Sequence, residues 1–353
     1  MTVLEVRRDD LAQTRVADEP RVALADGEAL LAVERFGLTA NVITYGVAGD
    51  TLGYWRFFPA SEDGWGRIPA WGFAEVVASA SEALDEGERL FGYVPMATHV
   101  LLTPQARGPL VLDRTRHRVE LPSAYNAYRR APQRPSDGDA RELVLRPLFL
   151  LCFLLADELE ATERSGAEQI LVSSASSKTA LGLAHELGAS GAKVVGLTSP
   201  RNLEFVRSRG IYDEVVPYAE LASLDPGVAT VAVDMAGDAA LRRQIHAHFG
   251  DALRRSVLVG ATHASAASFA PDPGLPGPEA ALFFVPDRLR ARSREWSPAM
   301  LEARVERAFA SFCAWTEDWL GIDEARGADD VLGAYRAVLA GEVPPDVARV
   351  ASL

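Results

Sequence analysis

Residues 168–199, EQILVSSASSKTALGLAHELGASGAKVVGLTS, predict a strand, a tight turn, a helix and a second strand. Residues 170–172 and 193–197 are short apolar runs typical of buried strands. Between them, residues 173–179 form a turn of small and hydroxylated residues, and residues 180–187 have helical spacing. When two such strands are parallel, the helix N-terminus faces the carboxyl edge of the sheet, where its N–H groups and dipole attract phosphate.

The turn lacks the glycines of the usual dinucleotide-binding fingerprint. At those positions, or in a close register, the chain has Ser174, Ser177 and Ala180. The helix dipole disfavours the cation of Lys178 at the helix N-terminus unless an anion lies nearby. We therefore interpret the turn as an altered phosphate site, with side-chain hydroxyls and a charge in place of close backbone approach. Its expected contacts are Ser174, Ser176, Ser177, Lys178 and Thr179.

The end of the second strand indicates which dinucleotide would bind. Sites that prefer NAD place an acidic residue there to bind the ribose 2′-hydroxyl. This chain instead has Ser199 and Arg201, and a hydroxyl and a guanidinium suit the extra charge of a 2′-phosphate. NADP(H) is therefore favoured. The alternative is an ordinary Ser-Pro helix start with Arg201 in solvent.

A nucleoside-triphosphatase is a remote alternative. Ser177, Lys178 and Thr179 imitate the end of the motif G-x-x-x-x-G-K-[ST], and Asp234 ends an apolar run as a magnesium-binding acid would. However, Val172 and Ser177 occupy both glycine positions, and their β-carbons would obstruct a backbone cradle for phosphate.

Composition excludes several classes of protein. The 353 residues carry a formal net charge of −13, which argues against nucleic acid or an anionic membrane as the main partner. The two cysteines and six scattered histidines have no metal-ligand spacing, so no metal site is expected. The N-terminus has no signal-peptide pattern, and the most apolar run, 147–156, is about half of a membrane span. A soluble, cytoplasmic protein is expected.

The first 120 residues predict short strands at 21–24, 29–36, 74–79 and 89–94, typical of a small β-barrel-like domain. An aromatic, glycine-rich stretch at 45–73 is suited to a pocket for an apolar or planar ligand. Tyr45 and Tyr54 are the favoured candidates in it, because a phenol can donate a hydrogen bond to a substrate carbonyl. The alternative is that these rings fill the core. Tyr125 and Tyr128 are spaced i, i+3 and predict one helix face, or else a solvated linker helix.

The rest of the chain alternates strands with helices. A buried helix is predicted at 143–159, a helix at 203–209, and strands at 211–216, 230–234 and 256–260. This rhythm predicts a parallel, doubly wound sheet. A strand at 281–285, a charged helical region at 288–320, a helix at 328–340 and a strand within 344–352 are expected to follow.

The order of these pieces resembles the medium-chain dehydrogenase/reductase superfamily, in particular its zinc-free, quinone-oxidoreductase-like members. The resemblance covers nearly the whole chain. SSASSKTALGLA at 173–184 with FFVPDRLRARSREW at 283–296 further resembles an uncharacterised branch that carries a "domain of unknown function" label. The other segments that carry the resemblance are LLAVERFGLTANVITYG, PAWGFAEVVAS, GERLFGYVP, GLTSPRN, TVAVDMAGDAAL and VLVGATHAS.

The resemblance implies a GroES-like barrel at 1–122 for the substrate, a Rossmann-type nucleotide-binding domain at 123–285, and a C-terminal helical segment at 286–353 that returns to the first domain. It implies an NADPH-dependent, zinc-independent reductase acting on an apolar carbonyl, enone or quinone, and a homodimer joined through residues 281–285. Tyr45 and Tyr54 would be catalytic, and Tyr218 would border the adenosine. The substrate pocket is expected to include Asn41, Trp55, Tyr125 and Tyr128. A catalytically silent protein that binds a nucleotide or small ligand on the same fold is the alternative.

Overall fold

The computed structural model describes residues 1–20, 23–136, 138–188, 191–259 and 274–353. The chain forms two compact units, Met1–Val144 with Gly321–Leu353, and Leu145–Leu320. The change of unit falls inside helix α2 (Asp139–Ala161), later than the predicted boundary at 122. The reason is that strand β10 (Ala127–Ala131) pairs with β6 (Arg89–Pro95) and β9 (Leu110–Asp113) of the first unit. The predicted C-terminal segment is likewise divided, and only its part from Gly321 belongs to the first unit.

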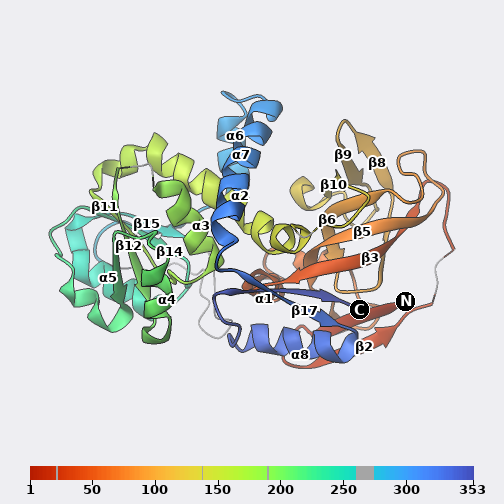
Figure 1. Ribbon diagram of the computed structural model, residues 1–353, viewed down its shortest axis with the longest axis horizontal. Coiled ribbons are helices and arrows are strands. Elements are labelled where there is room, and N and C mark those ends of the chain that lie inside the picture. Colours follow the sequence, from red (N-terminus) through yellow and green to blue (C-terminus); the bar gives the residue numbers. More distant parts are fainter. Residues whose placement is uncertain (21–22, 137, 189–190, 260–273) are drawn as a thin grey trace. The chain divides into compact units, whose positions relative to one another are not determined.

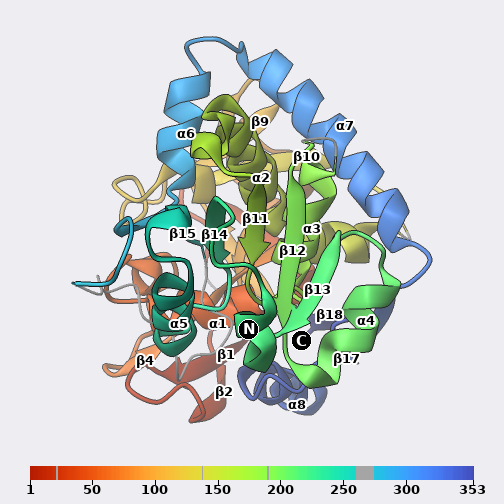
Figure 2. The ribbon, with the colours of Figure 1, turned by 90° about the vertical axis from the view of Figure 1, so that its left-hand side faces the viewer.

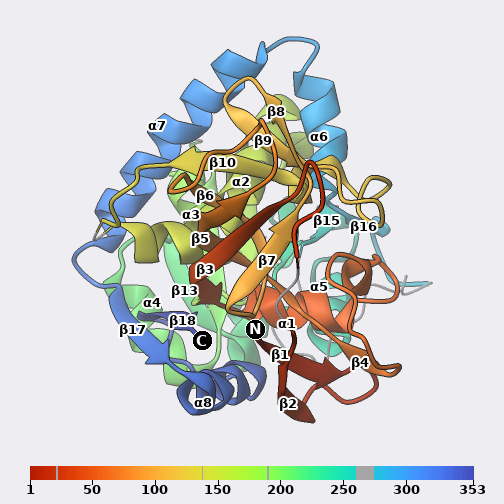
Figure 3. The same cartoon turned by 90° about the vertical axis from the view of Figure 1, so that its right-hand side faces the viewer.

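The first unit is built on mostly antiparallel sheet (Figure 3). In its nine-stranded sheet the last strand of the chain lies beside β3, and β7 also pairs with β3. Helices α1 (Ala40–Val47) and α8 (Ala328–Leu339) complete the unit. The small sheet has the order β2 (Thr14–Asp18), β1 (Thr2–Arg7), β4 (Trp65–Gly66), and the large one β17 (Gly321–Arg326), β18 (Val347–Ser352), β3 (Ala29–Leu38), β5 (Pro69–Ser79), β6 (Arg89–Pro95), β10, β9 (Leu110–Asp113), β8 (Pro104–Arg107), with β7 (His99–Leu102) off this path.

The second unit is built on one parallel six-stranded sheet (Figure 2). Numbered by their order along the chain, its strands lie as 3-2-1-4-5-6, the doubly wound order of dinucleotide-binding folds. The predicted fold class is therefore confirmed. From edge to edge the strands are β13 (Glu214–Pro217), β12 (Lys193–Thr198), β11 (Gln169–Val172), β14 (Thr230–Asp234), β15 (Leu253–Leu258) and β16 (Ala280–Leu282).

Both faces of this sheet are covered, because side chains alternate along a strand. In β11, Ile170 and Val172 belong to a core with α2, α3 (Lys178–Leu187) and α4 (Leu203–Ser208). Leu171 belongs to the core of the opposite face, with α5 (Ala239–Phe249). This explains why the strands appear in the sequence as unbroken apolar runs rather than as an alternating pattern.

Two further helices pack on the α2 side of the second unit (Figure 1). They are α6 (Val285–Arg292) and α7 (Pro298–Thr316). The single helical region predicted at 288–320 is therefore wrong: it is broken after Arg292, and Ser297 starts α7 as its N-cap by accepting a hydrogen bond from Met300 N.

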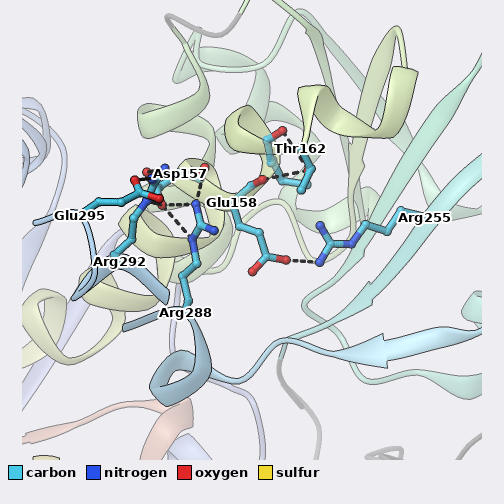
Figure 4. Close-up of polar contacts among 8 residues, drawn as sticks. Asp157, Glu158, Thr162, Arg255, Arg288, Arg292 and Glu295 are labelled. Atoms are coloured by element: carbon cyan, nitrogen blue, oxygen red, sulfur yellow. Dashed lines mark hydrogen bonds and ion pairs between the residues drawn. The ribbon is translucent and has the colours of Figure 1, made fainter. Parts of the chain in front are cut away.

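Ion pairs fasten α6 to α2 (Figure 4). The Asp157 carboxylate accepts hydrogen bonds from the Nε and terminal nitrogens of both Arg288 and Arg292, with the Arg292 contact at 2.7 Å. Next to it, Glu158 pairs with Arg255 of β15. The side chains of Asp157, Arg288 and Arg292 are only 12–16% exposed, so solvent screens these pairs less than it would screen a surface pair.

Other predicted elements differ at their ends. Of the strand predicted at 21–24, residues 21–22 lie outside the described residues and Ala23 and Leu24 form no strand. Residues 260–265, which end the segment VLVGATHAS, also lie outside them. The strand predicted at 281–285 is β16, and it ends at Leu282. Helix α6 already begins at Val285, because a proline is well accommodated in the first turn of a helix. None of the helices in the described ranges is long and apolar enough for a membrane span.

Candidate functional site

The turn after β11 keeps the shape of a glycine turn without the glycine. Ser174, at the first fingerprint position, has φ of 51°, in the left-handed region that glycine normally fills. Its backbone N–H donates to the Tyr218 hydroxyl at 3.0 Å, which anchors the turn. The turn also packs closely on β12, where a β-carbon on Gly196 would lie 2.9 Å from Ala175 Cβ. The glycine that permits close backbone packing is therefore Gly196 of β12 rather than a residue of the turn itself.

Helix α3 starts directly behind this turn. Ser177 is its N-cap, and its hydroxyl accepts from Ala180 N at 3.2 Å. Lys178 and Thr179 form the first helical turn and are half-buried, as are Ser174 and Ser176. A positive side chain, hydroxyls and the positive end of the helix dipole therefore meet at one corner of the sheet, an arrangement that suits an anion.

The end of β12 supplies a second set of polar groups at the same carboxyl edge. Thr198 is 1% exposed, and its hydroxyl has no hydrogen-bond partner among the described residues. Ser199 starts the short helix Pro200–Asn202, on which Arg201 is exposed. Asn202 Nδ2 donates to Ser176 Oγ at 2.9 Å, which ties this segment to the α3 turn. The structure thus brings together the predicted residues at both strand ends, together with Tyr218.

A buried network fixes the edge between β11 and β14. Ser173 Oγ donates to Asp234 Oδ1 at 3.0 Å and accepts from Met235 N and Ala236 N. Asp234 also accepts from Gly237 N, and its second oxygen pairs with Arg242 at 3.1 Å. Both Asp234 oxygens therefore have structural partners. This argues against the NTPase alternative, which needs this carboxylate for magnesium.

In the first unit, aromatic side chains gather around Tyr45. The ring of Tyr45 lies 4.7 Å from that of Tyr54, 5.4 Å from Tyr93 and 6.3 Å from Tyr125. Trp71 lies 5.3 Å from Tyr93. We call these five residues the tyrosine cluster. Tyr45, Tyr54 and Tyr93 are buried in it, whereas Tyr125 and Trp71 are half-buried at its rim.

The hydroxyl of Tyr45 is arranged as a hydrogen-bond donor. Its oxygen accepts from Asn41 Nδ2 at 2.7 Å and from Trp71 Nε1 at 3.1 Å, which leaves its proton to be donated. Burial raises the pKa of Tyr45 well above its usual 10. Burial does the same to the pKa of Tyr54, whose hydroxyl lies 3.1 Å from that of Tyr125. Because the pKa of each phenol is raised in the folded protein, both stay protonated at neutral pH and at every pH below 10.

Two predicted pocket residues have other roles. Tyr125 ends a short 3-10 helix, Ser123–Tyr125, and Tyr128 lies in β10, so the predicted shared helix face and the linker helix are both wrong. Tyr128 is fully buried, with its ring against Gly92, where a β-carbon would lie 2.2 Å away. Burial raises its pKa to about 12. Trp55 also packs elsewhere, against Gly49 and Gly66, as a core residue.

Sequence reasoning missed several residues of these sites. Arg118 is buried beneath the tyrosine cluster, where it pairs with Asp113 at 2.8 Å and donates to the Tyr125 carbonyl. The sequence gives no indication that Arg118 and Asp113 are buried, because a charged residue between turns is usually solvated. Trp71 belonged to the aromatic stretch, but nothing in the sequence marked its indole as a partner of Tyr45. In the described part of the chain, no group of three or more His, Cys, Asp or Glu side chains is placed to hold a metal ion.

The left-handed conformation of Ser174 gives a stability test. Ser174→Gly removes a steric cost of about 1–2 kcal/mol and is expected to raise the melting temperature by a few degrees, whereas Ser174→Val is expected to lower it. The measurement is thermal unfolding followed by circular dichroism. Ser176→Gly is the control: Ser176 has no positive φ, so its replacement brings no gain. A Ser174→Gly protein less stable than the parent would contradict the assignment.

The fold is shared with several solved structures. CurA from Vibrio vulnificus, in complex with NADPH, has a TM-score of 0.68 and 13% identity, with 100% of this chain and 99% of CurA covered. A quinone oxidoreductase from Pseudomonas syringae pv. Tomato DC3000 has a TM-score of 0.61 and 15% identity, with 99% of each chain covered. The yhdH oxidoreductase from Salmonella enterica, in complex with NADP, has a TM-score of 0.54 and 15% identity, with 100% of each covered. At these identities the likeness shows the fold.

No curated protein matches the chain. A family model does, over residues 36–344, and its description agrees with the branch that the sequence resembles. The chain therefore belongs to the family described as "Protein of unknown function (DUF2855)".

Proposed function

We propose that the protein is an NADPH-dependent, zinc-independent reductase that transfers hydride to an apolar carbonyl, enone or quinone. The observation that carries the proposal is the conformation of the turn after β11. Ser174 keeps the left-handed φ of the missing glycine, and Ser177 caps the helix that Lys178 begins. Strained non-glycine conformations cluster at functional sites, which supports a ligand at this turn.

The residues at the carboxyl edge fit a dinucleotide. Ser176, Lys178 and Thr179 would hold the pyrophosphate at the α3 N-terminus. Ser199 and Arg201 would hold the 2′-phosphate, because no acidic residue ends β12. The buried hydroxyl of Thr198 has no partner in the described ranges, and a ligand at this edge would satisfy it. The similar structures solved with NADPH or NADP support the same cofactor.

When bound, the cofactor supplies the hydride, and the chain's own residues supply orientation and a hydrogen bond. We assign the hydrogen bond to Tyr45, which would donate its proton to the developing oxyanion of the substrate. Asn41 and Trp71 position this hydroxyl. The hydroxyls of Tyr54 and Tyr125, in the same cluster, contact each other. The surrounding rings offer an apolar or planar substrate a matching surface.

Cofactor preference tests the nucleotide part of the proposal. Arg201→Gln removes the guanidinium expected at the 2′-phosphate, so its Kd for NADPH should rise about tenfold while its Kd for NADH stays unchanged. Quenching of tryptophan emission during titration measures both constants. Arg207→Gln is the matched control, an exposed arginine on α4 whose side chain donates to the Val215 carbonyl.

An equal effect of Arg201→Gln on both cofactors would place the 2′-phosphate elsewhere. If the parent protein binds neither NADPH nor NADH, the reductase and the silent nicotinamide-binding protein both fail.

Turnover tests the role of Tyr45. Tyr45→Phe keeps the ring but removes the hydrogen bond, so kcat for NADPH oxidation with a quinone or enone should fall about a hundredfold while the Kd for NADPH is unchanged. Absorbance at the NADPH band follows the reaction. Tyr335→Phe is the control, because Tyr335 is also buried in the first unit and donates to the Leu11 carbonyl.

A fully active Tyr45→Phe enzyme would remove Tyr45 from the mechanism. Binding of NADPH by the parent protein without turnover across a broad panel of quinones and enones would favour the silent binding protein.

The homodimer implied by the resemblance stays a prediction. It is supported by β16, an edge strand of the six-stranded sheet, which ends in the exposed side chain of Leu282 and is followed by that of Phe284. Sedimentation velocity of the whole chain would detect a monomer if this is wrong.

A further inference from the structure

A groove on the second unit lies apart from the nucleotide edge. It has a volume of about 420 Å³ and runs between α2, α3 and α7, with Phe153, His185, Arg304, Arg307 and Ser311 in its walls. The helices lie side by side in Figure 2. His185 comes seven residues after Lys178, which places it roughly 10 Å along α3 from the phosphate-binding turn. The groove therefore belongs to the other end of this helix.

One wall of the groove carries two exposed positive charges. Arg304 and Arg307 are three residues apart on α7, so they lie on the same face and repel each other. Neither has an ion pair with any described residue, and Arg304 instead lies over the Trp296 ring at 4.6 Å. The positions three and four residues away from either arginine on α7 carry no carboxylate.

One of the two carboxylates of α7 forms an ion pair with another helix. Glu306 pairs with Arg146 of α2 at 2.6 Å. The one carboxylate that lines the groove, Glu186, has His185 Nδ1 as its partner at 3.2 Å. Glu186 thus puts one carboxylate in the groove, but it forms no ion pair with Arg304 or Arg307 within the described residues.

The groove also carries neutral polar groups and an apolar surface, from α7 itself and from α2 and α3. His185 Nε2 lies 3.5 Å from Ser311 Oγ, and the His185 ring is held against Phe312 and Trp315. Phe153, from α2, gives the groove an aromatic side chain. The groove thus combines two guanidinium forks, a hydroxyl and an imidazole with a ring that an organic group can contact.

We propose that this groove binds a small organic phosphate, with the phosphate against Arg304, Arg307 and Ser311 and the organic body against Phe153. Two unpaired positive charges match a phosphate dianion better than a carboxylate monoanion, and guanidinium forks donate to phosphate oxygens in pairs. The volume lies in the usual range for small-molecule sites and exceeds what inorganic phosphate needs. The site uses none of the residues assigned to NADP(H), so it does not depend on the proposed function.

Calorimetric titration of the full chain with phenyl phosphate tests the proposal, first without nucleotide and then with saturating NADPH. The parent protein is expected to bind phenyl phosphate in both cases, and to bind inorganic phosphate more weakly. Arg304→Gln combined with Arg307→Gln should weaken binding at least tenfold. The matched control is Arg254→Gln with Arg294→Gln, which removes two exposed arginines of the same unit outside the groove and should bind like the parent.

Ser311→Asp is a second, independent variant. It places a carboxylate at an exposed position in the groove and should also abolish binding, which keeps the test decisive if the double arginine variant loses its unfolding transition. No binding by the parent, or equal affinity in the groove variants and the control, would overturn the site. Benzoate binding as tightly as phenyl phosphate would overturn the phosphate assignment. Loss of phenyl phosphate binding when NADPH is added would show that the probe uses the nucleotide edge instead.

Discussion

The hydroxyl of Ser173 holds together the edge on which the second unit's chemistry depends. It joins the ends of β11 and β14 by bonding to Asp234 and to two backbone amides that follow it. With that edge fixed, the next residue, Ser174, is held in a left-handed conformation by its bond to Tyr218. A strained non-glycine residue persists only where its surroundings over-determine it. The glycine-poor sequence therefore changes the chemistry of the turn while keeping its shape.

The tyrosine cluster of the first unit follows the same logic with different groups. Buried phenols are costly unless their polar ends are satisfied, and here Asn41 and Trp71 satisfy the oxygen of Tyr45. Behind them, Arg118 is neutralised by Asp113 and holds the Tyr125 carbonyl and the Tyr128 hydroxyl. The result is a set of neutral hydroxyl donors in an apolar setting, which suits stabilisation of negative charge that develops on a carbonyl oxygen.

The sequence predicted most of the second unit because a parallel sheet buried on both faces has continuous apolar strands, as at 230–234. It predicted the first unit less well. The spacing of Tyr125 and Tyr128 fits a helix face, but Gly92 leaves room for the Tyr128 ring only when residues 127–131 form a strand. Strand β17, with its exposed acidic residues, gives no apolar signal and forms by pairing with β18. Neither Ser173 with Asp234 nor Asp113 with Arg118 was predictable, because such pairs depend on contacts that no local pattern encodes.

We propose that the turn after β11 holds a pyrophosphate although serines replace its glycines. Hydrogen–deuterium exchange of the whole protein, with and without saturating NADPH, measures this directly. We expect slower exchange of the backbone amides in two segments together, residues 173–179 and residues 198–202, with NADH protecting the second segment less. Unchanged exchange in both segments at saturating NADPH, or protection confined to other parts of the chain, would contradict it.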